Sequence, residues 1–178
     1  NDAERLSQGP AMRVVVGWNG PKRNAASTSE MSRFETELLT RRDNLKALER
    51  LNVQWVKRAM AHTVHKRVIL DIDSSESPVH GKQEEAAYNG HFECVCYHPL
   101  FCFNQFGDCE GVVLRPGNVH SADGWKEFIE PIVERYLKMA ARLLFRADAA
   151  FAKPELYEYL ESKRIGYAIR LPANAVLQ

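Results

Sequence analysis

RVILDIDSSESPVHG, residues 67–81, is the stretch that decides the fold. Its apolar, mostly β-branched start leads into Asp71, Ile72 and Asp73 and then into a serine-rich segment, which predicts a buried strand ending in a polar turn. Strand side chains alternate in direction, so Asp71 and Asp73 share one face, opposite Leu70 and Ile72. An apolar core does not tolerate two bare carboxylates. They therefore face water, hydrogen-bond donors or a cation, and a divalent metal ion is the most specific of these possibilities.

The pattern of an apolar strand that ends in an aspartate recurs at residues 142–147, RLLFRA, which precede Asp148. Between the two acidic strands, residues 92–103 and 111–115 are rich in β-forming residues, and Asn104, Gly107 and Asp108 join them. This composition predicts an antiparallel hairpin after the first strand. The acidic ends of the two core strands are expected to lie close together and to form one site.

Helices are predicted after the hairpin and after the second acidic strand. Ser121 is placed to cap a helix whose apolar residues recur at helical spacing from Trp125 to Ala140. Pro131 is expected to kink or break this helix. Pro154 is placed as the first residue of another helix, and residues 167–171 are predicted as a last strand.

The part of the chain before residue 67 is predicted to be helical and basic. Ser or Thr at 27–29 caps one helix, and a second runs from Asp43 as N-cap to about residue 62, while a breaker cluster at 17–21 ends a weaker helical pattern. Residues 1–67 hold 13 Lys and Arg against 7 Asp and Glu, whereas residues 68–178 hold 11 against 16. This asymmetry is compatible with a nucleic-acid contact beside a metal-binding core, and equally with solvated helix faces.

Composition excludes several other classes of protein. No apolar run approaches the length of a membrane span and no signal-peptide pattern is present, so we expect a cytoplasmic protein without a membrane partner. Cys94, Cys96, Cys102 and Cys109 fall within sixteen residues but lack the paired C-x-x-C spacing of a zinc site. We interpret them as small buried hydrophobic residues with reduced thiols.

The three aspartates suggest metal chemistry. Carboxylates bind hard divalent ions such as Mg²⁺ through oxygen, and two such ions about 4 Å apart activate water and stabilise a leaving oxygen in phosphoryl transfer. Carboxylate pairs are common in proteins, so this chemistry alone does not decide the function.

Five stretches in order resemble the catalytic domain of bacterial insertion-sequence transposases of the DDE type. They are ILDIDSSESPVHG (69–81), YNGHFECVCYHPLFCFNQFGD (88–108), LRPGNVHSADGW (114–125), LFRADAAFAKPELYEYLE (144–161) and GYAIRLPANAVLQ (166–178). The resemblance implies an α/β, ribonuclease-H-like fold, in which a mixed sheet of an antiparallel hairpin plus parallel strands is flanked by helices. It also implies a catalytic domain at residues 65–178, incomplete at its C-terminus, after a partial, basic helical segment at 1–64.

The resemblance assigns roles residue by residue. In that family the first catalytic aspartate ends the first core strand in a D-S-T or D-T-T context, which matches Asp73, and the second ends the fourth strand, which matches Asp148. Asp71 is a supporting carboxylate or the ligand itself. Asn118 and His120 lie where the family places residues close to the acidic site, although turn chemistry also explains Asn118.

Cofactors and partners follow from the same resemblance. It implies two Mg²⁺ or Mn²⁺ ions in the complete enzyme, held by Asp73, Asp148 and a later Glu. The implied partners are the transposon ends and target DNA, bound by a homo-oligomer in the bacterial cytoplasm at the nucleoid. The implied reaction is metal-dependent cleavage and transfer of DNA strands.

This sequence departs from one motif of that family. The family's third acid sits on a later helix, in a Tyr, two residues, Arg, three residues, Glu, six residues, Lys pattern. Only Tyr167 is followed at this spacing by an arginine, Arg170, and the next position of the pattern is Asn174 rather than Glu. We therefore expect a transposase truncated before its third acid, with weak metal binding and little or no strand-transfer activity.

Two other interpretations remain open at this point. The strand with Asp71 and Asp73 also fits the opening motif of haloacid-dehalogenase-like phosphatases, in which Asp71 forms an aspartyl-phosphate and Asp73 is the general acid. That fold continues with alternating strands and helices on a parallel sheet. The second interpretation is a non-catalytic remnant that binds DNA or the full-length transposase.

Overall fold

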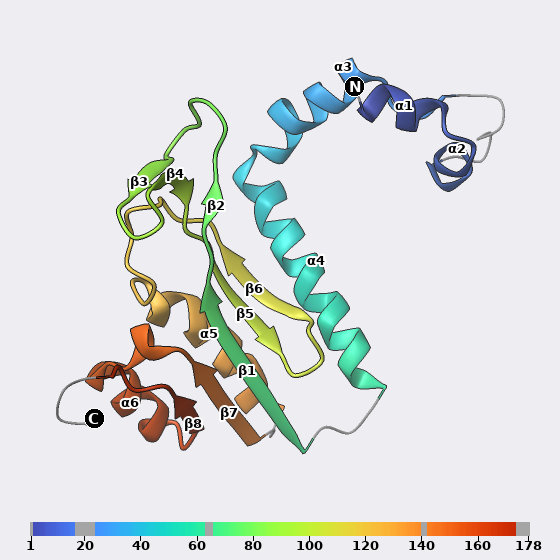
Figure 1. Ribbon diagram of the computed structural model, residues 1–178. Coiled ribbons are helices and arrows are strands. Elements are labelled where there is room, and N and C mark those ends of the chain that lie inside the picture. Colours follow the sequence, from blue (N-terminus) through green and yellow to red (C-terminus); the bar gives the residue numbers. More distant parts are fainter. Residues whose placement is uncertain (1, 17–23, 63–65, 140–141, 174–178) are drawn as a thin grey trace. The chain divides into compact units, whose positions relative to one another are not determined.

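The structure is a computed structural model that describes residues 2–16, 24–62, 66–139 and 142–173 (Figure 1). The chain divides into two compact units, residues 1–51 and 52–178. The predicted breaker cluster at 17–21 and the predicted helix end at Ala140 fall wholly or partly outside the described residues.

The first unit is built from helices. They are α1 (Asp2–Gln8), α2 (Pro10–Val16), α3 (Thr28–Arg33), the π-helical η2 (Phe34–Leu39) and the first part of α4 (Arg42–Ala61). Ser27 caps α3 as predicted: its hydroxyl accepts from the backbone N–H of Glu30, whose carboxylate accepts in return from Ser27 N at 2.7 Å. The predicted start of α4 was wrong by two residues, because the helix begins at Arg42 and Asp43 lies in its first turn rather than at its N-cap.

The second unit contains a five-stranded sheet in the order β6-β5-β1-β7-β8. These strands are β1 (Arg67–Ser74), β5 (Leu100–Asn104), β6 (Cys109–Val113), β7 (Arg142–Ala147) and β8 (Gly166–Ile169). β1 pairs antiparallel with β5, as β5 does with β6, whereas β1 pairs parallel with β7, as β7 does with β8. The predicted ribonuclease-H-like mixed sheet, with an antiparallel hairpin and parallel strands, is confirmed.

Helices provide the crossovers that parallel neighbours require. α5 (Trp125–Leu137) precedes β7 and packs against β6 and β7, while α6 (Pro154–Ser162) lies between β7 and β8 in sequence and packs against β8 (Figure 1). Pro154 is the first residue of α6, as predicted. Between β7 and α6, the chain forms the short 3-10 helix η3 (Ala149–Phe151).

The β-rich run at 92–103, predicted as one side of the hairpin, forms strands of two different sheets. It divides into β5 of the large sheet and β4 (Cys94–Tyr97), which joins β2 (Ser77–Pro78) and β3 (Ala87–Asn89) in a separate sheet of order β2-β4-β3. The division falls at His98 and Pro99. His98 is buried and its Nδ1 lies 2.9 Å from Val119 O, and Pro99 has no N–H to offer a strand ladder.

Two details of α5 also differ from prediction. The N-cap is Gly124, with φ of 68°, rather than Ser121, and no side chain among the described residues caps the helix. Such a left-handed backbone suits glycine. The helix continues through Pro131 from Trp125 to Leu137, so the predicted break does not occur. Burial of Ile129, Ile132, Val133 and Tyr136 on one face compensates for the hydrogen bond that the proline removes.

The core of the second unit lies between the sheet and these helices. It contains Val68, Leu70 and Ile72 of β1, and the buried side chains of β7, α5, α6 and the end of α4 pack with them, among them Phe145, Ile129, Val133, Leu156, Leu160, Val56 and Met60. The intervening residues of β1 are less buried, so Asp71 and Asp73 lie on the opposite face, as predicted.

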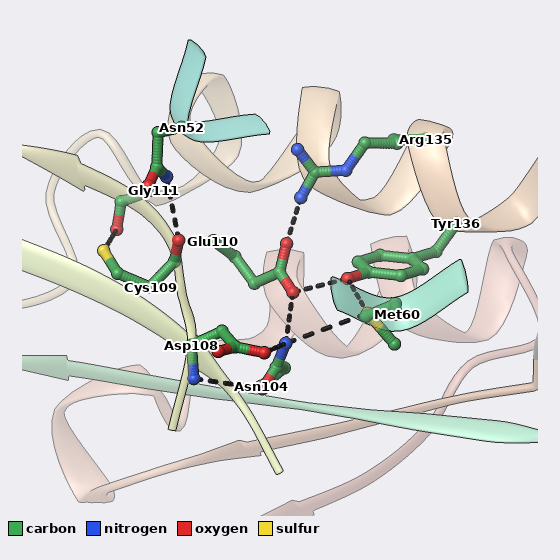
Figure 2. Close-up of polar contacts among 9 residues, drawn as sticks. All are labelled: Asn52, Met60, Asn104, Asp108, Cys109, Glu110, Gly111, Arg135 and Tyr136. Carbon is green, nitrogen blue, oxygen red and sulfur yellow. Dashed lines mark hydrogen bonds and ion pairs between the residues drawn. The ribbon is translucent and has the colours of Figure 1, made fainter. Parts of the chain in front are cut away.

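A buried polar network connects β6, β5, α5 and α4 (Figure 2). The carboxylate of Glu110, whose side chain is 0% exposed, accepts hydrogen bonds from Tyr136 Oη, from Arg135 Nη2 and from Asn104 Nδ2, the last at 2.8 Å. Tyr136 Oη also contacts Met60 Sδ at 3.0 Å. Burial, together with the hydrogen bond to Glu110, raises the pKa of the Tyr136 hydroxyl.

All four cysteines are free thiols. Cys96 and Cys102 are fully buried, which confirms the interpretation for these two, whereas Cys94 and Cys109 are half-buried. Burial raises the pKa of the Cys96 and Cys102 thiols. Among the residues that the structure describes, no helix combines the length and the apolar character that a membrane crossing requires.

Candidate acidic site at the ends of β1 and β7

The pairing of β1 with β7 brings Asp73 and Asp148 to one edge of the sheet. The two strands run parallel, with Asp71 opposite Arg146 and Ile72 opposite Ala147 as the last pairs of the ladder. Asp73 and Asp148 are the next residue of each chain segment. Both line a shallow groove of about 610 Å³. The structure therefore places the two predicted catalytic aspartates together, although they are far apart in sequence.

Backbone groups orient each of these carboxylates. Asp73 Oδ1 accepts from the N–H of Ser74 at 2.8 Å, and Asp148 Oδ1 accepts from the N–H of Ala150 at 3.0 Å as the N-cap of η3. Within the described ranges, the Oδ2 atom of neither aspartate has a hydrogen-bond or ion-pair partner, and both residues are exposed. Each side chain thus keeps an oxygen that can accept an external ligand.

Asp71 lines the same groove but is engaged differently. Its two oxygens accept from Nε and Nη2 of Arg146, each at 2.5 Å, so a single guanidinium occupies both of them. The hydrogen bonds and charge of Asp71 raise the pKa of the Arg146 guanidinium. Of the three aspartates, Asp71 is therefore the one already neutralised by a cation.

Asn118 and His120 do not line the groove. Both are exposed, and His120 Nδ1 accepts from Ala122 N at 3.2 Å. Their loop is held by the buried Arg115, which donates to the carbonyl oxygens of His120, Ser121 and Asp123 at 3.3, 3.0 and 2.7 Å. Burial lowers the pKa of the Arg115 guanidinium. Arg115 thus anchors the backbone of this loop, and neither Asn118 nor His120 is among the residues that line the groove.

Sequence reasoning missed two groove residues, Arg146 and Arg170. Each lies at or next to the end of a parallel strand, and Arg170 follows β8 directly. The carboxyl ends of neighbouring parallel strands meet at one edge of a sheet, so their positions were available as a signal in the sequence. The groove consequently presents three carboxylates, from Asp71, Asp73 and Asp148, and two guanidinium groups.

The free carboxylate oxygens of the groove suit a hard divalent ion, but among the described lining residues they come from two alone. Exposed carboxylate oxygens are the ligands that Mg²⁺ and Mn²⁺ prefer, and Asp73 and Asp148 supply them on adjacent strands. In the parts of the chain that the structure describes, no group of three or more His, Cys, Asp or Glu side chains is arranged to hold a metal ion. The two aspartates therefore fit a metal ion as part of a larger ligand set.

The topology contradicts the haloacid-dehalogenase interpretation. β1 is followed in the large sheet by the antiparallel strands β5 and β6, whereas that fold requires alternating strands and helices on a parallel sheet. Asp71, the nucleophile of that interpretation, has both oxygens bound by Arg146.

Comparison with solved structures finds distant likenesses to transposases. The Mos1 mariner paired end complex with Mn has a TM-score of 0.39 and 13% sequence identity, covering 70% of this chain and 41% of that one. The Mos1 Strand Transfer Complex has a TM-score of 0.36, 16% identity and coverage of 71% and 41%. The Drosophila P element transposase strand transfer complex has a TM-score of 0.32 and 10% sequence identity, covering 94% of this chain and 46% of that one. The chain spans less than half the length of these proteins, and likenesses at this level carry no functional argument.

Comparison with family models identifies the family of the chain, which the distant solved structures do not. No curated protein matches the chain. The model of the family described as transposase DDE domain group 1 matches residues 1–178, which is the whole sequence. With this match over its full length, the chain belongs to the transposase DDE domain group 1 family.

Proposed function

We propose that this chain is the part of a DNA transposase that supplies two metal-binding carboxylates, those of Asp73 and Asp148. One observation carries the proposal: both residues follow the last paired residues of two adjacent parallel strands, line one groove and keep a free oxygen each. Family membership supplies the chemical context, and the oxygen donors fit Mg²⁺ or Mn²⁺.

The aspartates and the arginines of the groove have different roles in binding DNA. Asp73 and Asp148 hold the divalent ions, which when bound supply Lewis-acid stabilisation of charge during cleavage of a phosphodiester. Arg146 and Arg170 line the same groove and attract the phosphate backbone, which two uncompensated carboxylates alone would repel. Such contacts read phosphates rather than bases, so binding is expected to weaken steeply with salt.

We infer that residues 65–178 form the catalytic domain, that residues 1–64 form a basic helical segment, and that the metal site needs a further acid beyond Asp73 and Asp148. We further infer a homo-oligomer on DNA in the bacterial cytoplasm. The second candidate, a non-catalytic remnant that binds DNA or a complete transposase, is favoured by one observation. The third carboxylate of the groove, that of Asp71, is bound by Arg146, and the described residues contain no group of three or more His, Cys, Asp or Glu side chains arranged to hold a metal ion.

Metal binding tests the proposal directly. We expect calorimetric titration of the 178-residue chain with Mn²⁺ to show millimolar affinity, because two carboxylates alone bind a divalent ion weakly. Asp73→Asn and Asp148→Asn are each expected to abolish the binding. Asparagine caps a helix as well as aspartate does, so Asp148→Asn keeps the cap of η3 while it removes the charge.

The matched control is Asp43→Asn, which changes an exposed aspartate of the first unit. It is expected to leave Mn²⁺ binding unchanged. Binding that persists in both groove variants would contradict the assignment of the two ligands. Micromolar affinity accompanied by nicking of plasmid DNA would show instead that a third ligand lies within these residues, and would reject the remnant.

A further inference from the structure

The ion pair between Asp71 and Arg146 in the groove consists of two hydrogen bonds. The two residues face each other across the parallel ladder of β1 and β7. Arg146 donates from Nε to Oδ1 and from Nη2 to Oδ2, each at 2.5 Å, which is the two-pronged geometry that arginine and a carboxylate form. The contact fixes the plane of the guanidinium as well as its position.

The pair leaves part of Arg146 available. A guanidinium carries five N–H donors, and Asp71 uses two of them, so three remain. The Arg146 side chain is 50% exposed and lines the groove together with Asp73 and Asp148. In the described part of the chain, no other hydrogen bond or ion pair engages its side chain.

We propose that Asp71 is a positioning residue, which orients Arg146 so that the remaining donors of its guanidinium bind a DNA backbone phosphate next to Asp73 and Asp148. The inference rests on the proposed function, since it concerns the same groove and takes DNA as the ligand. Arginine loses much side-chain entropy when it binds an anion from a free state, and an arginine already held by a carboxylate has lost most of it beforehand. Asp71 therefore acts through Arg146 and not as a metal ligand.

The proposal predicts a change in DNA affinity that is opposite in direction to the change that charge alone predicts. Replacing a groove aspartate with asparagine removes a negative charge, and electrostatics alone then predict tighter binding of DNA. Asp73→Asn follows this rule, because among the described residues the Asp73 carboxylate accepts a hydrogen bond only from the backbone N–H of Ser74. Asp71→Asn removes the same charge from the same strand face but releases Arg146, so it is expected to weaken binding by about fivefold.

The experiment is a fluorescence anisotropy titration of a labelled 30-base-pair DNA duplex with the full chain, in EDTA and across a salt series. Four variants are compared with the wild type: Asp71→Asn, Asp73→Asn, Arg146→Gln and the double variant Asp71→Asn/Arg146→Gln. Arg146→Gln is expected to weaken binding and to reduce the slope of log K against log salt by about 0.9, the value for one phosphate contact. Asp71→Asn in the Arg146→Gln background is expected to cause no further weakening.

The outcomes separate this inference from the proposed function. If the wild type binds DNA and Asp71→Asn tightens binding as Asp73→Asn does, Asp71 is only a charge and the inference is overturned, while the proposed function stands. If Asp71→Asn weakens binding equally with and without Arg146, its effect does not act through that residue, and the inference is again wrong. Absence of DNA binding by the folded wild type would overturn both.

Discussion

Substitution of Glu110 by alanine is expected to lower the free energy of unfolding by about 3–5 kcal/mol, the cost of removing one partner from a buried ion pair. The carboxylate is fully buried and accepts from three side chains, those of Tyr136, Asn104 and Arg135 (Figure 2). Without it, the buried phenol of Tyr136, the buried amide of Asn104 and the partly exposed guanidinium of Arg135 lose their common acceptor. Met60 of α4 contacts the same phenol, so a shift of the Tyr136 ring would disturb this contact as well.

Urea unfolding followed by circular dichroism measures this effect. Glu110→Gln keeps the shape of the side chain and one acceptor oxygen, so a smaller loss is expected than with alanine. Glu127→Ala on the exposed face of α5 is the control for loss of a glutamate, and a change within about 0.5 kcal/mol is expected. A loss below about 1 kcal/mol for Glu110→Ala would show that the network does not hold the second unit together.

Gly117→Ala is expected to destabilise the protein by about 3 kcal/mol, at the upper end of the cost of overpacking. A Cβ atom at this position lies 2.5 Å from Cys96 O and 2.8 Å from Cys96 Sγ, and it also meets Ala87 O too closely. Two of these atoms belong to the backbone of β3 and β4, so neither can move without displacing a strand. The Gly117 carbonyl also accepts from Asn89 Nδ2 at 2.6 Å, which fixes it in place.

Gly90 offers a matched control for Gly117, because a Cβ atom there meets no heavy atom within 4 Å. Gly90→Ala is expected to change the free energy of unfolding by less than about 0.5 kcal/mol, and a Gly→Ala change at a compatible site can even stabilise. Thermal unfolding of both variants, followed by circular dichroism, measures the difference. Equal melting temperatures for the two would contradict the close packing of the loop against the small sheet.

The strands that carry the two aspartates were predictable because their signals are local. Residues 68–70 and 143–145 are apolar runs with aspartates within the next three residues, and the structure forms β1 and β7 there. Pro154 at the start of α6 and Ser27 as the cap of α3 follow from backbone chemistry within one turn of helix. The resemblance to transposases then provided the mixed order of strands, which no local pattern specifies.

The features that were missed depend on contacts between distant segments. Glu110 resembles an ordinary surface glutamate in sequence, and only the packing of α5 over β6 buries it. Asp71 and Arg146 meet because two strands pair in one particular register, which a sequence alone does not reveal. The run at 92–103 is rich in β-forming residues on both sides of His98 and Pro99, so its composition does not show that these two residues separate two sheets.

The parallel pairing of β1 with β7 also has a consequence for how the protein folds. Asp71 and Arg146, which mark the end of this ladder, are 75 residues apart, so the ladder closes a long loop and is expected to form late. Until β7 docks beside β1, Asp73 and Asp148 are on separate segments. A divalent ion that needs both therefore has no site on a partly folded chain, and its binding stabilises only the state in which the central strand has acquired its parallel neighbour.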